Sequence, residues 1–358
     1  MNSKTVFKYA TIIVILGIAG YIGTTVKNKF DTKEKDEYNM IKNYLLNDSP
    51  LYGYNKPKLW IHTKYEINAR KWLDFYSKNT YDLNQEYIHI CIQSIIQHCS
   101  DDFHICLISD ESFSKLLPSW DIQLSNVAQP FRDQYRKLAM AQLVYYYGGF
   151  IIPNSFLCLK NIFPLFKSGI YGNKPFVLET INRTSNQEVS PRKMSFIPDE
   201  YFMGAMKNDP QIESYIRYLK NNTKLPHFTE EPTFKGYNSE FLMTNINKNN
   251  FNMLDGKFIG IKNTKNKPIL IEELFEDNNI LLSNELYGIY IDQDEILKRH
   301  KYQWFAELSK KQVFETNNIL VKYMKIAVEP QPPKTTIKSL DDLEYEHIGN
   351  PHECVVSI

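Results

Sequence analysis

The sequence predicts an α/β fold in which helices flank a mostly parallel, Rossmann-like sheet. Two observations carry this prediction. Short apolar runs alternate with amphipathic helical segments, and a glycine pair, Gly148 and Gly149, closes the second helix just before a third apolar run. This strand, helix, strand, helix, strand order is typical of such sheets. Because ligands on them bind at the carboxyl ends of the strands, we expect functional residues in the loops that follow.

The elements of the first half can be placed from their patterns. Four apolar runs are predicted to be strands: 57–62, 104–109, 150–152 and 156–159. Two segments are predicted to be helices: 84–99, whose isoleucines share one face, and 133–147, which ends at the glycine pair.

Further elements follow in the second half of the chain. The patterns predict a strand at 175–179, a helix over 209–221, a β pair formed by 253–260 and 268–271, and a helical stretch over 303–327. The tail 329–358 contains PQPPK and lacks periodicity, so we expect it to be disordered. These patterns predict one domain over 56–328.

Composition excludes several classes of protein. The 358 residues contain 42 Lys and Arg against 41 Asp and Glu, so a dedicated nucleic-acid binder is not expected. A hydrophobic content of 43% excludes a disordered chain, and a mean hydropathy of −0.41 excludes a polytopic membrane protein. The five cysteines show no zinc-site spacing and are predicted to be buried free thiols.

The N-terminal region predicts a single-pass membrane protein in contact with a lipid bilayer. Residues 7–26 carry no charge except Lys8 and are just long enough to cross a bilayer. No clear cleavage site follows, which favours an uncleaved signal anchor between a short tail, 1–6, and a polar stem, 27–55. A cleaved signal peptide is the alternative. The lysines after residue 26 favour a cytosolic body, whereas three glycosylation sequons would suit a lumenal one.

The order of motifs resembles a known family. A strand that ends in His62, a helix that leads into YYYGG, and the later segments 157–165 and 202–210 follow one another over residues 56–220. This order resembles the nucleotide-diphospho-sugar transferases with the A-type glycosyltransferase fold. Within these it is similar to the capsular-polysaccharide and mannosyltransferase-like groups that carry a DxD sugar-binding region. It is also similar to a set of proteins of large DNA viruses.

The resemblance implies both a fold and an activity. It implies an A-type glycosyltransferase-like domain that transfers a hexose from a UDP- or GDP-linked nucleotide sugar to a glycan or glycoprotein acceptor, as in polysaccharide biosynthesis. It also implies an enzyme anchored in an endomembrane or in a host or viral membrane, if residues 7–26 span it. No catalytic base can be assigned from spacing alone.

The chain departs from this family at the DxD motif, which falls on Pro153, Asn154 and Ser155. In the family the two carboxylates hold Mg²⁺ or Mn²⁺ against the diphosphate, because hard cations prefer anionic oxygen ligands. Here both carboxylates are missing, so the resemblance implies no metal at this position. Asn154 and Ser155 remain candidates for contact with the nucleotide sugar, with an ordinary turn after a strand as the alternative.

The helix before the glycine pair also departs from the family. The places where the family has an Asp and an Arg hold Lys137 and Met140, while Arg132, Arg136 and Lys137 make this helix basic. One hypothesis is that these cations neutralise the diphosphate without a metal. The other is that the site has decayed and the fold serves a structural or glycan-binding role. Solvated helix residues are the simpler interpretation of the two arginines.

Four further residues complete the candidate site. His62 and Asp110 follow the first two strands, where this fold usually meets the nucleotide, although a buried structural histidine is an equal alternative. Asp292 and Asp294 follow an apolar run and form an intact D-x-D, which predicts a Mn²⁺ or Mg²⁺ site. The alternative is that Asp294 and Glu295 form the N-terminal cap of a helix. The predicted nucleotide-sugar-binding set is His62, Asp110, Arg132, Arg136, Lys137, Asn154 and Ser155.

Overall fold

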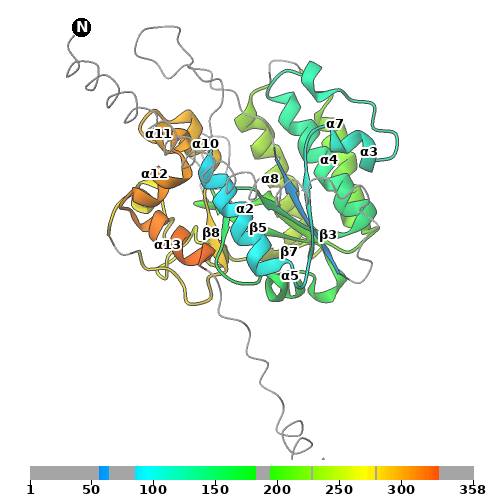
Figure 1. The fold of residues 1–358 in the computed structure, drawn as a ribbon. Helices are drawn as coiled ribbons and strands as arrows, with labels where there is room; N and C mark the ends of the chain where they lie inside the picture. Colours follow the sequence, from blue (N-terminus) through cyan, green and yellow to red (C-terminus); the bar gives the residue numbers. More distant parts are fainter. Residues whose placement is uncertain (1–55, 64–84, 183–193, 227–228, 279, 330–358) are drawn as a thin grey trace, which may run out of the picture. The chain divides into compact units, whose positions relative to one another are not determined.

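The computed structural model describes residues 56–63, 85–182, 194–226, 229–278 and 280–329 (Figure 1). The chain divides into two units, Met1–Val328 and Glu329–Ile358, and all the helices and strands below lie in the first. The predicted membrane anchor 7–26 and stem 27–55, and the tail beyond residue 329, lie outside the described residues. No helix within the described ranges is both long enough and apolar enough to cross a bilayer.

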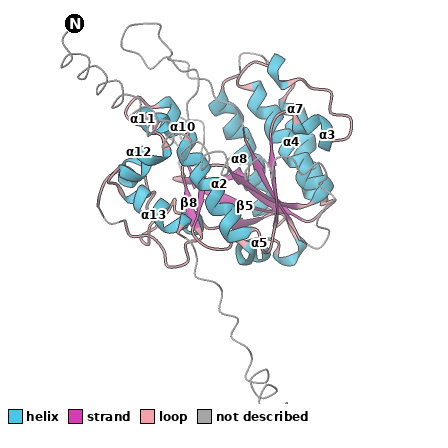
Figure 2. Cartoon of the chain, viewed as in Figure 1, coloured by secondary structure: helices cyan, strands magenta, loops and turns pink. Residues whose placement is uncertain are grey.

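A six-stranded mixed sheet forms the centre of the first unit, in the order β2-β1-β3-β6-β5-β7 (Figure 2). Its strands are β1 Lys58–His62, β2 His104–Ile108, β3 Gly149–Pro153, β5 Phe176–Ile181, β6 Phe196–Ala205 and β7 Asn252–Leu254. Strand β1 runs parallel to β2 and β3, whereas β6 runs antiparallel to β3 and β5. The predicted α/β class, a mixed sheet flanked by helices, is therefore confirmed.

Helices cover both faces of this sheet because its central strands are apolar on both sides. Successive residues of β1 point to opposite faces: Leu59 and Ile61 pack in one core cluster and Trp60 in the other. The first cluster lies under α2 Glu86–Cys99 and α5 Phe163–Gly169. The second lies under α3 Ser112–Leu116, α4 Phe131–Tyr147, α7 Pro210–Asn222 and α8 Glu231–Asn247.

The glycine pair after α4 sets the start of the third strand. Gly148 ends the helix with φ 70°, and its carbonyl accepts a 2.9 Å hydrogen bond from the buried Trp60 indole. Gly149 has φ 110°, and a Cβ there would lie 2.2 Å from the Lys58 carbonyl oxygen. Only glycine tolerates both the positive φ and this close approach, which lets β3 lie beside β1.

The C-terminal part of the described chain joins the sheet through a second, two-stranded sheet. Strand β4, Phe156–Cys158, pairs antiparallel with β8, Gly288–Tyr290. The Ile291 N–H then donates to the Ser155 carbonyl at 3.2 Å, which places the start of α10, Gln293–Lys298, beside the end of β3. Short helices follow on the side of α2 (Figure 1): α11 Gln303–Glu307, α12 Lys310–Glu315 and α13 Ile319–Val328.

One prediction for the second half of the chain is wrong. The β pair of 253–260 with 268–271 is absent: β7 pairs with β5 instead, and Asp255 caps a 3₁₀ helix, Gly256–Ile259. Helix α9, Ile271–Phe275, follows. The helical stretch predicted over 303–327 is confirmed as three short helices, and Ser309 starts the second of them through a capping box with Gln312. Two further 3₁₀ turns, Leu124–Asn126 and Tyr171–Asn173, complete the elements.

The predicted state of the cysteines is confirmed for the four that the structure describes. Cys91, Cys99, Cys106 and Cys158 are all free and buried. Burial raises the pKa of the Cys91 thiol, since a thiolate is poorly solvated in an apolar core. We expect these thiols to be unreactive packing residues.

Candidate functional site

A cavity lies at the carboxyl ends of β1 and β3, with about 970 Å³ of empty space including its open mouth. Its walls come from β1, α4, β3, β6, α8, β8 and α10, which are far apart in the chain. The lining residues are His62, Asp133, Arg136, Lys137, Met140, Ile151, Ile152, Pro153, Asn154, Ser155, Glu200, Tyr201, Met203, Lys235, Tyr290, Asp292, Gln293 and Asp294.

The fold brings most of the predicted site residues together at this cavity. Five of the predicted nucleotide-sugar-binding residues line it, and both carboxylates of the alternative D-x-D do so as well. The other two predicted residues, Asp110 and Arg132, line a neighbouring groove, and Arg136 belongs to both hollows. Their juxtaposition is a property of the fold.

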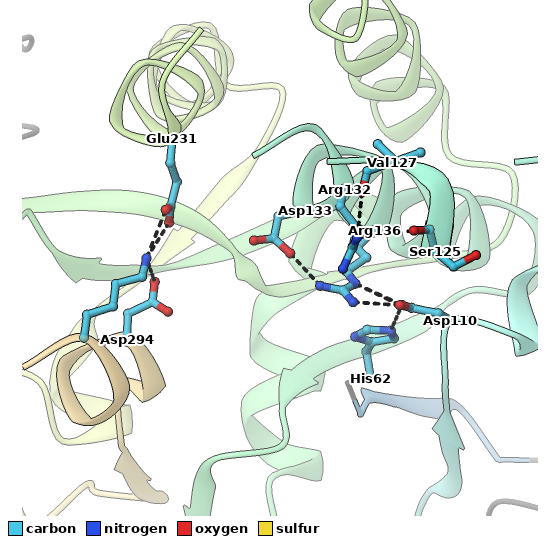
Figure 3. Close-up of polar contacts among 10 residues, drawn as sticks. His62, Asp110, Ser125, Val127, Arg132, Asp133, Arg136, Glu231 and Asp294 are labelled. Atoms are coloured by element: carbon cyan, nitrogen blue, oxygen red, sulfur yellow. Dashed lines mark hydrogen bonds and ion pairs between the residues drawn. The ribbon is translucent and has the colours of Figure 1, made fainter. Parts of the chain in front are cut away.

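Arg136 is the centre of a charged network between the two hollows (Figure 3). Its Nε and Nη2 donate to the Asp110 carboxylate at 2.9 and 2.7 Å, and its Nη1 donates to Asp133 at 2.7 Å. His62 Nε2 lies 2.9 Å from Asp110 Oδ1 on the other side of that carboxylate. Burial favours a higher pKa for Asp110, but the hydrogen bonds from His62 and Arg136 outweigh it and lower the pKa.

A second pair, Lys137 with Glu200, joins α4 to β6 in the wall of the cavity. The two charged groups lie 2.6 Å apart, with side chains only 12% and 6% exposed. Asn238 on α8 donates to Glu200 Oε1 at 3.2 Å. Burial disfavours both charges, but their mutual attraction outweighs it, so the pKa of Lys137 is raised and that of Glu200 is lowered. Both groups are therefore charged at neutral pH.

The third cation of the cavity, Lys235 on α8, lies 3.7 Å from the buried Asp199 of β6. Asp199 also accepts hydrogen bonds from Thr180 Oγ1 and from the Tyr201 N–H, each at 3.1 Å. Burial, with repulsion from Glu200, raises the pKa of Asp199. The three cations of the cavity wall, including Lys235, thus each have a carboxylate partner from this chain.

Sequence reasoning missed four of these residues. Asp199, Glu200 and Lys235 lie on β6 and α8, which the patterns did not predict. Asp133 forms an i, i+3 ion pair with Arg136. The transferase family that the sequence resembles has an Asp and an Arg at the same spacing one helical turn later, at the places of Lys137 and Met140. That spacing was the signal in the sequence that could have identified Asp133.

Asn154 and Ser155 occupy the turn after β3, at the position of the family's DxD motif. They are 6% and 1% exposed and line the cavity. Within the part of the chain that the structure describes, neither the Asn154 amide nor the Ser155 hydroxyl has a hydrogen-bond partner. Unpaired buried polar groups are unfavourable and uncommon, so these two side chains are available to a polar ligand.

The residues present do not fit the metal of that family. Asn154 and Ser155 offer neutral oxygens, and Asp292 uses a carboxylate oxygen to cap α10 by accepting the Asp294 N–H at 3.0 Å. Asp294 in turn pairs with Lys298 at 3.2 Å. Among the described residues, no three His, Cys, Asp or Glu side chains are grouped so as to hold a metal ion. The alternative that Asp294 and Glu295 cap a helix is right about the helix but wrong about the residue, because Asp292 is the cap and the other two lie in the first turn.

The neighbouring groove lies beyond the end of β2, with about 1610 Å³ of empty space including its mouth. Hydroxyl groups, carboxylates and an indole line it, among them Ser109, Asp110, Glu111 and Trp120. Arg132 donates to the Val127 and Ser125 carbonyls at 2.8 and 3.4 Å (Figure 3). This arginine therefore holds the loop before α4.

Comparisons with known proteins give a distant structural similarity. Neither a protein-family model nor a curated protein matches the sequence. Among solved structures, the chain is similar to the PaToxG glycosyltransferase, at 12% identity and a TM-score of 0.32. That similarity covers 54% of this chain and 70% of the other.

Proposed function

We propose that this protein has a glycosyltransferase-like role and binds a nucleotide sugar at the carboxyl ends of β1, β2 and β3. The observation that carries the proposal is the pair of adjoining hollows that share Arg136 at this edge of the sheet. Sheets of this kind bind ligands there. Two adjoining hollows suit a ligand with two unlike ends, such as a nucleoside and a sugar.

Each part of a nucleotide sugar has a place in this arrangement. The groove offers the Trp120 ring to a base and the Asp110 and Glu111 carboxylates to ribose hydroxyls. The sugar would then occupy the cavity, and the diphosphate would lie at Arg136 between the two. Since Arg136 already binds two carboxylates, it must exchange one of them for phosphate oxygens. The acceptor, a glycan or glycoprotein, would approach through the mouth of the cavity.

A second function is favoured by a different observation. The DxD position holds no carboxylate, and Arg136, Lys137 and Lys235 are all paired within the chain. A catalytically inactive relative that binds glycans, or has a structural role, requires neither a metal nor an unpaired cation. This alternative predicts sugar binding without transfer.

Calorimetric titration of the full-length protein with UDP- and GDP-sugars, with and without EDTA, tests the first function. We expect binding that EDTA does not change, because no metal site is formed by the described residues. Arg136→Ala should weaken binding by roughly 1–3 kcal/mol, the scale of one charge-assisted hydrogen bond. Arg217→Ala, on the exposed face of α7, is the matched control and should leave binding unchanged.

Two other outcomes would be decisive. If EDTA abolishes binding and Asp294→Ala does the same, a Mn²⁺ or Mg²⁺ site at Asp292 and Asp294 replaces the metal-independent proposal. If no nucleotide sugar binds but glycans do, the non-catalytic function replaces the first.

A further inference from the structure

We infer that the cavity is a binding site for an uncharged sugar and discriminates against acidic ones. The inference starts from the charges on its wall. Four carboxylates, from Asp133, Glu200, Asp292 and Asp294, face three cations, from Arg136, Lys137 and Lys235. Away from Arg136 and its partner Asp133, three carboxylates still face two cations, which makes that part of the cavity a poor place for an anionic group.

The carboxylates just behind the wall increase this imbalance. Arg136 binds Asp110 as well as Asp133, and Lys235 is nearest to the buried Asp199. Lys298, which pairs with Asp294, also pairs with Glu231 at 2.9 Å. These cations have more carboxylate partners than their own number, so little positive charge is left for an acidic sugar. A sugar carboxylate or sulfate in the cavity would meet like charges, which disfavours its binding.

The neutral polar groups of the cavity point to hydroxyl groups as the partners. Asn154 and Ser155 are at least nine-tenths buried, line the cavity and have no hydrogen-bond partner among the described residues. An amide and a hydroxyl can each donate to and accept from a sugar hydroxyl. A ligand hydroxyl can also donate to the oxygens of Glu200 or Asp292, which a carboxylate ligand cannot do.

Aromatic rings complete this chemistry. Tyr201 and Tyr290 line the same cavity, and the Lys137 ammonium lies 5.4 Å from the Tyr201 ring centroid. A tyrosine ring offers an apolar face beside a polar tip, which suits the C–H face and the hydroxyls of a pyranose. The cavity therefore combines ring surface, hydrogen-bonding groups and negative charge, and its ligand class is a neutral pyranose.

The sugar has two conceivable sources, the donor nucleotide sugar or a free glycan. The inference rests on the proposed function only for the first source, and the test separates the two. Matched probes differ only in the charge of the sugar: UDP-glucose against UDP-glucuronate, and methyl glycosides of neutral hexoses against the corresponding methyl uronides. Free UDP reports on the nucleotide part alone. Binding to the full-length protein is measured by calorimetry for the nucleotides and by saturation-transfer NMR for the glycosides.

We expect the neutral member of at least one matched pair to bind about tenfold or more tightly than its acidic partner, as like-charge repulsion requires. Asn154→Ala should weaken binding of the neutral sugar, and Asp292→Asn should narrow the discrimination by improving binding of the uronide. Glu285→Gln removes an exposed carboxylate that does not line the cavity. It should change neither the affinity for the neutral sugar nor the discrimination against the uronide. Melting temperatures of all variants identify any that fail to fold, and Ser155→Ala provides a second test of the neutral contacts.

The outcomes separate the inference from the proposed function. If UDP binds but the two UDP-sugars bind equally, the nucleotide-sugar function stands and the charge selection is wrong. If no nucleotide binds while a neutral glycoside binds and its uronide does not, the selection stands and the function is the glycan-binding one. Equal or tighter binding of the acidic probe in every pair, or no binding of any neutral sugar in either form, overturns the inference.

Discussion

At the scale of single residues, the candidate site is held together by ion pairs between residues of this chain. Asp110 shows the principle, since one carboxylate receives hydrogen bonds from both His62 and Arg136. Such a half-buried, ion-paired carboxylate stabilises the fold only while it is ionised. Its contribution should therefore depend on pH.

Asp110→Asn should lower the free energy of unfolding near neutral pH by roughly 1–3 kcal/mol, because it leaves Arg136 short of a partner. The pKa of Asp110 is lowered in the folded protein, so its stabilisation is complete above the ordinary carboxyl pKa of about 4. It is lost as the pH falls from there toward the folded-state pKa. Urea unfolding from pH 7 down to pH 3 should thus show the difference shrink. Glu111→Gln, at the exposed neighbour, is the control, and a difference that is constant with pH would contradict this account.

Gly149→Ala should be among the most damaging single substitutions in the sheet. The new Cβ would lie 2.2 Å from the Lys58 backbone oxygen at a residue with φ 110°. We expect a loss of about 3 kcal/mol or more in the free energy of unfolding, measured by urea titration. Gly172→Ala separates the two causes, because Gly172 has φ 72° but open space around its Cβ position. That control should lose only about 1–2 kcal/mol.

At the scale of elements, the central strand β6 contains the buried carboxylates Asp199 and Glu200 and was also the hardest to predict. Its sequence, FIPDEYFMGA, places Pro198, Asp199 and Glu200 in the middle of a buried strand. Charged pairs at buried positions remove the apolar alternation that identifies strands. Helix α8 was missed for a related reason, since Gly236 and several asparagines weaken its pattern. The first three strands are uniformly apolar, so they and the glycine pair were predicted correctly.

The same reasoning explains which part of the site the sequence predicted. His62, Arg136, Lys137, Asn154 and Ser155 follow or flank the predicted strands, so the rule about carboxyl ends found them. Asp292 reaches the cavity only through the pairing of β4 with β8, which local patterns do not specify. The resemblance to a transferase family pointed to the edge of the sheet where the cavity lies, whereas the charge pairing of each cation emerged only from the structure.

Lys137→Met tests how much the ion pair between Lys137 of α4 and Glu200 of β6 contributes to stability. It leaves Glu200 buried and uncompensated, so the free energy of unfolding should fall by roughly 3–5 kcal/mol. The double variant Lys137→Met, Glu200→Gln should recover much of this loss, because the lone charge is gone. Lys298→Met breaks an exposed pair with Glu231 instead and should lose less than about 1 kcal/mol. Thermal and urea unfolding measure all three, and a double variant no better than the single one would refute the unpaired-charge explanation.

At the scale of the whole molecule, we propose that residues 7–26 anchor the protein in a membrane as a single span. The support is the length and composition of this apolar segment. Deletion of residues 1–26 should release the body into the soluble fraction, while the full-length chain should stay with membranes after alkaline carbonate extraction. A melting transition in the released protein would show that its body is folded. A truncated protein that still sediments wholly with membranes would rule out a single anchor.

The pairing of β4 with β8 has a consequence for protein synthesis. A ribosome that has reached residue 280 has already made all six strands of the main sheet, but not the strand and helix that carry Tyr290, Asp292 and Asp294. Contacts between segments so distant in sequence form late, and the edge of β4 stays unpaired until then. The nascent protein therefore acquires its sheet before its cavity. Premature termination in this interval would yield a chain with most of the core and no complete binding site.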